Sequence, residues 1–372
     1  MAQTIIASSA AQTKKKWAGA IFSSSIPESY WGSHFMKEGS ANNAPNAPIH
    51  LVTDLEKDSG DTVNYDIYMQ LTGAPTFGDD NLDGNEESLT PYSDSIVINQ
   101  VRKAADSGGT MTRKRTTNDH RMIARNKLTD WWSRFFDEAV FMNISGARGT
   151  NADYIMPVGS TYAIDGQSLV ARSSDKIIYA GAATSKASLV NTDKFSYTAI
   201  DKCVTKADVE GGGSDGVIRM TPMRIDGVDK FVCLMHTFQE HDLRTSTSSG
   251  QWLDIQKAAA TNNGSKNPIF TGSLGEYRGV VLHKHNKVTQ FTDYGAGSNL
   301  AAARAIFMGR QAMVAAFGSP ANDLRFDWAE EWKDFKNRLA IATKCIVGMK
   351  RPQFNSKDVN SIAIDSYAAQ PY

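Results

Sequence analysis

Hydrophobic and polar residues alternate through residues 62–71 and again, over a shorter length, through residues 95–101. A period of two is typical of a β-strand with one covered face. In the first stretch five residues share one side: Val63, Tyr65, Ile67, Met69 and Leu71. The residues between the two stretches are rich in glycine and proline, which favour turns. The pattern predicts a long β-hairpin that ends in a broad loop.

A helical period, with apolar residues at i, i+3, i+4 and i+7, predicts a long helix over residues 117–145. Asn118 is placed to cap its start, and Gly146 to end it. Four aromatic side chains follow one another closely on the apolar side: Trp131, Trp132, Phe135 and Phe136. The polar side carries Asp130, Arg134, Asp137 and Glu138. We expect this helix to be the spine on which other elements pack, because its aromatic residues bury a large area.

The remaining residues predict shorter elements. Helices are expected at 197–209, where Thr198 and Asp201 resemble a capping box, at 251–260, and over the alanine-rich stretch 301–317. Strands are expected at 217–220, 231–235, 278–283, 339–347 and 359–364, with loops and short strands over 147–194. The predicted fold class is therefore α+β.

The first 50 residues do not show either period. They are rich in Ala, Ser, Asn, Gln and Pro, with Trp17, Tyr30 and Trp31 scattered among them. This composition predicts an extended arm that docks a few aromatic side chains on something else.

The chain carries 40 basic and 40 acidic side chains, but the two signs are segregated. Residues 58–101 contain nine acids and no lysine or arginine, whereas residues 102–127 contain eight bases and two acids. Blocks of opposite sign suggest complementary surfaces, within one chain or between neighbouring copies. Five of the acids lie in the hairpin loop: Asp79, Asp80, Asp83, Glu86 and Glu87. Their candidate basic partners are Arg113, Lys114, Arg115 and Arg121.

Each charged block also has another interpretation. The acidic cluster lacks the ligand spacing and closing glutamate of an EF-hand calcium loop, so a solvated or partner-facing tip fits better. The basic block suits phosphate contacts, and a nucleic-acid-coating protein stays a weak alternative. A net charge of zero and the lack of interleaved aromatic residues argue against a dedicated nucleic-acid binder.

Other classes are disfavoured by simple features. No apolar run of 18 residues is present, so no membrane span is expected. The N-terminal lysines follow a mixed segment instead of preceding an apolar core, so no export signal is expected. Cys203, Cys233 and Cys345 are widely spaced, which fits a reducing compartment better than a disulfide framework or a zinc site.

Catalytic motifs are scarce. The sequence contains no phosphate-binding GxxxxGK[ST] and no CxxC, and we expect no cofactor. The best candidate chemistry is a histidine cluster, His236, His241, His283 and His285, with Asp242 beside it. His283 and His285 would share a face of a strand, as metal ligands do, but no HExxH is formed. A metal-dependent enzyme using this cluster is kept as the alternative function.

The hairpin and the arm both need a partner. A two-stranded hairpin is marginally stable by itself in water, and the arm has aromatic residues but no core. Docking of each on identical copies would give a closed shell, ring or filament. The residues alone therefore predict a self-assembling structural protein.

The order of these elements resembles the major capsid proteins of tailed bacteriophages, with the Hong Kong ninety-seven-type fold, and more narrowly the phage N-four-like capsid protein family. The motifs that carry the resemblance are GDTVNYDIYMQLTGAPTFGDDNLDGNEESL (60–89), the helix 117–145, FVCLMHTFQEHDLR (231–244), NPIFTGSLGEYRGVVLHKH (267–285), IFMGRQAMVAAFG (306–318) and WAEEWKDFKNRLAIATKCIVGMKRPQF (328–354).

The resemblance implies a division of the chain into an N-terminal arm (1–50), an extended loop or E-loop hairpin (51–112), a peripheral (P) domain with the spine helix (113–194), an axial (A) domain (195–330) and a return to the P domain (331–372). It implies an icosahedral shell of pentamers and hexamers around double-stranded DNA, contacted non-specifically. The protein would be in host cytoplasm before assembly and in the virion afterwards.

The resemblance also implies other partners: a portal and, in some shells, a decoration protein. Only about 50 residues precede the loop, so we expect a separate scaffolding protein. Some shells of this fold crosslink through an E-loop lysine, but this chain has no lysine between Asp58 and Val101, so no such crosslink is expected.

Overall fold

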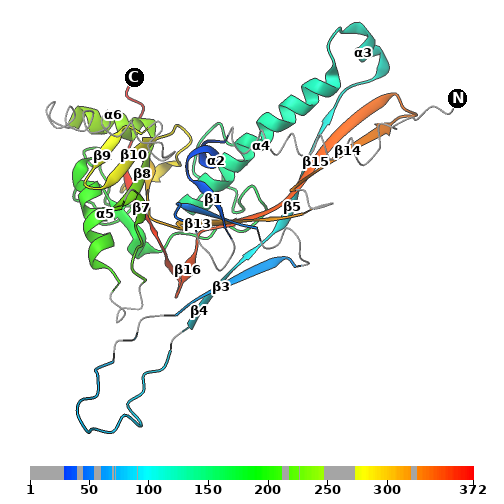
Figure 1. The fold of residues 1–372 in the computed structure, drawn as a ribbon. Coiled ribbons are helices and arrows are strands. Elements are labelled where there is room, and N and C mark those ends of the chain that lie inside the picture. Colours follow the sequence, from blue (N-terminus) through cyan, green and yellow to red (C-terminus); the bar gives the residue numbers. More distant parts are fainter. Residues whose placement is uncertain are drawn as a thin grey trace.

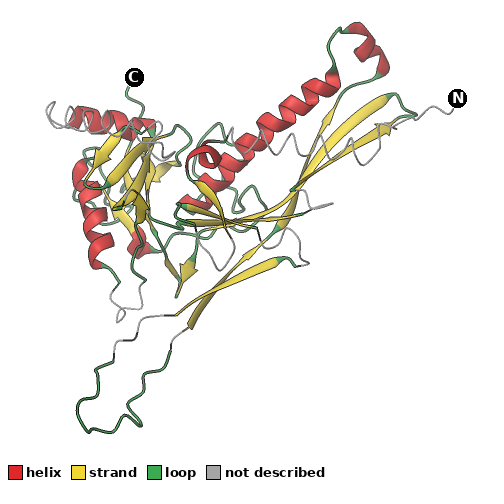
Figure 2. Ribbon diagram, viewed as in Figure 1, coloured by secondary structure: helices red, strands yellow, loops and turns green. Residues whose placement is uncertain are grey.

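The computed structural model describes residues 29–39, 45–53, 60–68, 71, 73–89, 91–211, 218–225, 227–246, 273–319 and 325–372. Two β-sheets lie side by side, and one long helix, α4 (His120–Ser145), runs from the junction between them to the far end of the molecule (Figures 1 and 2). Elements of both types are mixed along the chain, which confirms the predicted α+β class.

The first sheet carries the spine helix. Its order is β1 (Met36–Gly39), β2 (Ile49–Val52), β13 (Met313–Gly318), β15 (Arg338–Lys350) and β14 (Phe326–Lys333), and β5 (Asn99–Asp106) also pairs with β15. Burial alternates along β15, so that Leu339, Ile341 and Thr343 face inward. The Trp132 indole of α4 donates a hydrogen bond of 2.7 Å to the Thr343 hydroxyl, which fixes the helix on this face.

The second sheet has the order β6 (Ile177–Tyr179), β18 (Ser361–Tyr367), β12 (Leu300–Met308), β8 (Val228–Met235), β10 (Val280–Lys284) and β9 (Gly275–Tyr277). Two further strands join it: β11 (Gln290–Tyr294) pairs with β12, and β7 (Met223–Ile225) pairs with β8. The helices α5 (Tyr197–Val209) and α6 (Thr237–Ser246) and the 3-10 turn η2 (Ser174–Lys176) accompany this sheet.

The predicted hairpin projects away from both sheets (Figure 1). Strands β3 (Thr62–Tyr68) and β4 (Pro91–Val97) pair only with each other among the described residues. Val63 and Ile96 face each other across the pair and pack on Val52 and Val314 of the first sheet. Only the base of the hairpin is therefore held by the body of the chain.

The start of α4 is capped by a side chain. Asp119 accepts hydrogen bonds from the backbone N–H groups of Arg121 and Met122 at 2.9 and 3.4 Å. The predicted cap, Asn118, lies one residue too early. A separate short helix, α3 (Thr110–Arg115), precedes this turn and was not predicted.

The end of α4 is closed by buried arginines. Gly146 adopts φ +69°, as expected of a helix-ending glycine, and its N–H donates to Met142 O at 3.0 Å. Each of the next three carbonyls accepts from a different guanidinium: Asn143 O from Arg351 at 2.9 Å, Ile144 O from Arg172 at 2.7 Å, and Ser145 O from Arg304 at 2.9 Å. These three side chains come from three separate parts of the chain, so the helix end joins them.

Two buried carboxylates balance this charge. Arg304 on β12 and Asp365 on β18 are direct cross-strand partners and form two hydrogen bonds, each of 2.7 Å. Asp358 on β17 (Lys357–Asp358), which pairs with β16 (Gln353–Phe354), accepts from Arg351 at 2.7 Å and lies 3.4 Å from Arg172. The negative end of the helix dipole supplies the remaining compensation for three positive groups.

Several sequence predictions were wrong. Residues 301–317 form the buried strands β12 and β13, separated by a turn, and not a helix. Alanine favours helix, but a run that is apolar on every side is also the pattern of a strand covered on both faces. Residues 218–220 are not a strand, and α5 has no capping box, since Ser196 occupies the cap position and Asp201 binds Arg278 at 2.8 Å.

The prediction for the N-terminal arm was wrong from Tyr30 onward. Residues Tyr30–His34 form helix α2, whose Trp31 is fully buried with its ring 5.0 Å from that of Phe141 on the spine helix. This part of the arm therefore packs on its own chain. Trp17 and the predicted helix 251–260 lie outside the described residues.

The buried charge cluster gives a stability prediction. Asp365→Asn keeps the side-chain shape but leaves Arg304 without its counter-charge, so the free energy of unfolding should fall by about 3–5 kcal/mol. Denaturant titration of the purified chain measures this. The control is Asp130→Asn, because Asp130 pairs with Lys127 on an exposed surface and should change stability by about 0.5 kcal/mol or less. Equal effects of the two substitutions would contradict a structural role for the cluster.

Candidate functional site

The tip of the hairpin is an exposed loop without regular secondary structure, here called the acidic loop (residues 73–89). All five predicted acids, Asp79, Asp80, Asp83, Glu86 and Glu87, are exposed. Large apolar side chains lie among them and at the loop base with more than half of their surface exposed: Leu71 (61%), Phe77 (70%), Leu82 (63%) and Leu89 (62%).

Short-range bonds give the acidic loop its shape. Asp80 N–H donates to Phe77 O at 3.2 Å, and Asn85 N–H donates to Leu82 O at 3.0 Å, which closes two turns. The Glu87 carboxylate accepts from Gly73 N–H across the loop at 2.6 Å. These bonds leave the apolar side chains uncovered, and clustered exposed apolar residues of this size are typical of an interaction surface.

The predicted basic partners lie at the opposite end of the molecule, where α3 and the start of α4 meet the β14–β15 turn (Figure 1). We call this region the basic tip (residues 110–122 and 332–337). Arg113, Lys114 and Arg115 are in α3, and the Arg113 guanidinium lies 5.0 Å from the centre of the Trp332 ring. Arg121 forms a 2.7 Å ion pair with Glu330 of its own chain.

The basic tip also exposes apolar side chains. Met111, Met122 and Trp332 are 62%, 51% and 46% exposed, and Phe335 is fully exposed with φ +47° in the β14–β15 turn. Such a backbone conformation is uncommon for an aromatic residue and is often found where a turn has a function. A pocket of about 350 Å³, lined by Arg113, His120 and Trp332 among others, opens at this tip.

The aromatic side chains of the spine helix lie inside the fold. Trp132, Phe135 and Phe136 are buried, and Trp131 is half-buried beneath Lys103, whose Nζ lies 5.3 Å from its ring centre. The rings of Trp132 and Phe326 are 4.9 Å apart, and those of Phe136 and Phe317 are 5.7 Å apart. These contacts join α4 to β13 and β14.

Two polar residues of the spine helix are also buried, although the sequence placed them on its polar side. The Glu138 carboxylate accepts from Ile155 N–H at 2.6 Å and from Met156 N–H at 2.8 Å, so it holds the loop that follows the helix. Asp137 accepts from Trp31 N–H at 3.4 Å, and burial raises its pKa to about 6. Nothing in the helical period distinguishes these acids from exposed ones.

The four histidines of the alternative hypothesis do not converge on one point. His283 is buried against Phe35, with ring centres 5.0 Å apart, and His285 lies 4.5 Å from the ring of Tyr30. Both therefore pack against α2. His241 is exposed on α6. Within the residues that the structure describes, no group of three or more His, Cys, Asp and Glu side chains is arranged to hold a metal ion.

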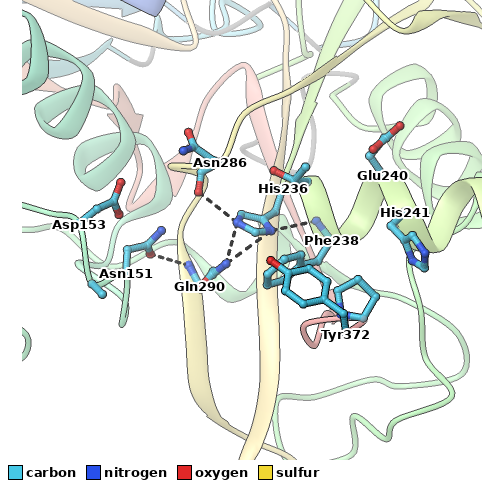
Figure 3. Close-up of a pocket in the computed structure, with 12 residues that line it drawn as sticks. Asn151, Asp153, His236, Phe238, Glu240, His241, Asn286, Gln290 and Tyr372 are labelled. Carbon is cyan, nitrogen blue, oxygen red and sulfur yellow. Dashed lines mark hydrogen bonds between the residues drawn. The ribbon is translucent and has the colours of Figure 1, made fainter.

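His236 lies beside a cleft of about 750 Å³ at the start of α6 (Figure 3). Its Nδ1 accepts from Phe238 N–H at 3.1 Å, so the proton of the neutral ring is on Nε2, which lies 3.0 Å from Asn286 O and 2.6 Å from the side-chain amide of Gln290. The carboxylates of Asp153 and Glu240 lie on opposite sides of this ring (Figure 3). The lining of the cleft mixes these polar side chains with Phe238, Pro371 and Tyr372.

A sequence model of the family described as phage capsid protein matches residues 5–370. The chain belongs to the phage capsid protein family. The expectation drawn from the motifs is confirmed, and the metal-dependent enzyme is not supported. Among the described residues, no helix combines the length and apolar character needed to cross a membrane.

Individual capsid proteins agree with this assignment. The chain is 25% identical to the major capsid protein of Pseudomonas phage KPP25 over 332 residues, 84% of this chain and 83% of that protein. It is 42% identical to a chain of the capsid of Ralstonia phage GP4, with both chains covered completely and a TM-score of 0.83. The Cyanophage Pam1 capsid chain, at 20% identity with 92% and 93% covered and a TM-score of 0.69, shares the fold.

The neutral state of His236 gives a pH prediction. Burial lowers its pKa from an ordinary 6.5 to about 4, so its contribution to stability is complete above pH 6.5 and is lost as the pH falls toward 4. The free energy of unfolding should fall over this range by roughly 2–3 kcal/mol from this group. In His236→Asn the amide oxygen replaces the Nδ1 acceptor without titrating, so the fall measured by denaturant titration should be smaller.

The control for this experiment is His241→Asn, since the His241 side chain is exposed in the folded chain as well as in the unfolded one. This variant should keep the pH dependence of the unmodified chain. If His236→Asn kept it as well, the neutral His236 would not be a source of acid sensitivity.

Proposed function

We propose that this phage capsid protein is the major shell subunit, and that copies associate by docking the acidic loop of one on the basic tip of another. Self-association is the common property of capsid proteins. The proposal assigns the contact to the two ends of the molecule, which carry opposite charge and exposed apolar side chains.

The observation that carries this proposal is the separation of the two surfaces. They project from opposite ends of one chain, so they cannot meet within it (Figure 1). Within the part of the hairpin that the structure describes, the contacts with the body lie at its base: Val63 and Ile96 pack on the first sheet, and Asp94 forms an ion pair with Lys350. A surface of one copy that reaches outward and complements a distant surface of the next is the geometry of a repeating assembly.

Apolar contact and charge have different roles at this interface. Exposed ion pairs contribute about 0–1 kcal/mol each, so ion pairs alone would give only weak binding between copies. Burial of large side chains such as Phe77 and Phe335 contributes more, at roughly 25 cal/mol per Å² of apolar surface. Many identical contacts per particle then multiply the effect.

The finer assignment follows the family. We propose that residues 51–112 act as the E-loop, that 113–194 and 331–372 form the P domain, and that 195–330 form the A domain around the centres of pentamers and hexamers. The shell would be icosahedral, would enclose double-stranded DNA with non-specific contacts, and would form in the host cytoplasm. A scaffolding protein, a portal and a decoration protein are its proposed partners.

Charge reversal tests the docking contact. Replacing Asp79, Asp80 and Asp83 by Lys should abolish particle formation, seen by negative-stain microscopy, and leave the chain soluble with an unchanged melting temperature. Replacing Arg113, Lys114 and Arg115 by Asp should do the same, because both changes set like charges against each other. Normal particles from either variant would contradict the proposed contact.

Mixing the two variants supplies the sharper control. Each then meets a complementary surface on the other, since a basic loop faces an acidic tip and an acidic loop faces a basic tip. We expect particles from the mixture at a yield well above that of either variant alone. If the mixture formed no particles, as each variant alone forms none, the substitutions would act within the chain and not between copies.

A second prediction concerns covalent bonding. The hairpin has no lysine between Asp58 and Val101, so mature particles should dissociate to a single band near 40.6 kDa in denaturing electrophoresis. A ladder of covalent multimers that resists reducing agent would show that the shell is stabilised by crosslinks in addition to non-covalent docking.

A further inference from the structure

A cavity of about 310 Å³ lies beneath the base of the hairpin. Its walls come from β2, β3 and β13, from the turn between β12 and β13, and from the chain around β16 and β17. Most of the wall is apolar: Val52, Val63, Tyr65, Ile218, Val314, Pro352, Phe354 and Val359. The cavity is about twice the volume that accepts one benzene molecule, roughly 150 Å³.

One end of the cavity is polar and cationic. Arg310, Gln311, Thr221, Asn360 and His50 line it, and no carboxylate is among its lining residues in the described part of the chain. The backbone of this turn is fixed, since Arg310 N–H donates to Thr221 O at 2.8 Å and Gln311 N–H donates to Ala47 O at 2.9 Å. The position of the Arg310 backbone at the cavity is therefore fixed.

The Arg310 guanidinium lacks a counter-charge. Its Nε is buried, and among the described residues it has neither a hydrogen-bond acceptor nor an acidic partner. A buried donor without an acceptor is costly, and an ionised one more so. The arginines at the end of α4 have carbonyl and carboxylate partners, whereas the half-buried Arg310 has no acidic partner among the described residues.

We propose that this cavity is a binding site for a small amphipathic carboxylate, with its apolar part between Val63, Val314 and Phe354 and its carboxylate on Arg310. Ligand sites in proteins are typically apolar cavities of about 300–1,000 Å³ with a few polar groups that fix orientation. A carboxylate on a guanidinium forms a charge-assisted hydrogen bond, which is the contact that Arg310 lacks.

Occupation of the site would affect the hairpin. Val63 and Tyr65 belong to β3, whereas Val52 and Val314 belong to the first sheet and Thr221 leads into the second. Tyr65 OH also donates to Asp94 at 3.0 Å, and Asp94 pairs with Lys350 of β15. A ligand that fills the space behind Tyr65 would therefore fix the base of the hairpin to the body of the chain.

The test adds 4-phenylbutyrate to the full-length, unassembled chain. Calorimetric titration measures binding, and thermal unfolding measures the melting temperature. The matched probes are 4-phenylbutanol, which is neutral, and 4-phenylbutylammonium, which is cationic. We expect the carboxylate to bind with 1:1 stoichiometry and raise the melting temperature, and the ammonium compound not to bind. Equal affinity of all three probes would overturn the proposal, because it would indicate non-specific apolar association.

Two variants locate the site. Arg310→Gln should weaken 4-phenylbutyrate binding by about tenfold or more, the usual effect of losing a charge-assisted hydrogen bond. Arg224→Gln is the control, because Arg224 is an exposed guanidinium outside the cavity lining, and it should bind as the unmodified chain does. Unchanged binding by Arg310→Gln would contradict the assignment.

A further readout does not depend on that substitution. Amide hydrogen exchange in β3 should slow when 4-phenylbutyrate is bound, and exchange in α6, far from the cavity, should not change. Slowing that is uniform over the chain, or confined to another region, would place the ligand elsewhere. These measurements are made without assembly, so they are independent of the proposed docking of the acidic loop.

Discussion

The closure of the spine helix by three buried arginines is the interaction on which the rest of this fold depends. Arg172, Arg304 and Arg351 each bind one of the last carbonyls of α4. Arg304 belongs to the second sheet, while Arg351 directly follows the longest strand of the first. The helix end thus fixes both sheets relative to one another.

The cluster tolerates burial of three cations because Asp358, Asp365 and the helix dipole supply negative charge at short range. The positive charges still repel one another, because burial together with neighbouring Arg351 lowers the pKa of Arg172 to about 9.

A rigid junction of this kind suits a subunit whose contacts lie at its extremities. The acidic loop and the basic tip are far apart, and a change of angle between the sheets would move one relative to the other by a distance that grows with their separation. Packing of Trp132, Phe135 and Phe136 along α4 extends the rigidity from the junction to the basic tip. At its base, Val63 and Ile96 of the hairpin pack on the first sheet and Asp94 pairs with Lys350, and the described residues beyond this base have no equivalent support. The subunit therefore combines a well-packed body with one long projection that is held at its base.

The sequence predicted the elements with a clear periodic pattern or a clear end signal. The hairpin alternates with period two, and α4 shows a helical period with Gly146 at its end. Prediction failed for the alanine-rich stretch that forms β12 and β13. Residues 301–317 are apolar except for Arg304 in β12 and for Arg310 and Gln311 in the turn before β13, so helix and buried strand could not be told apart. The acidic partners of Arg304 and Arg172 are distant in sequence, and Arg351 binds Asp358 only seven residues away, but no local pattern reveals these pairs. The acidic loop and the basic block were recognisable from charge alone, but their location at opposite ends required the fold.

The segregated charges of a chain with no net charge act mainly at short range. At physiological ionic strength the screening length is about 8 Å. Electrostatic attraction between the acidic loop of one copy and the basic tip of another would therefore act only when the two are almost in contact. Charge at this distance selects the partner surface and its register more than it adds affinity. The exposed apolar residues Phe77, Leu82 and Phe335 would by themselves accept many partners, including the wrong face of a neighbour. If an acidic loop met another acidic loop, or a basic tip another basic tip, repulsion between like charges would disfavour the contact. In the proposed docking, the arrangement that remains is head to tail, which is the one that repeats.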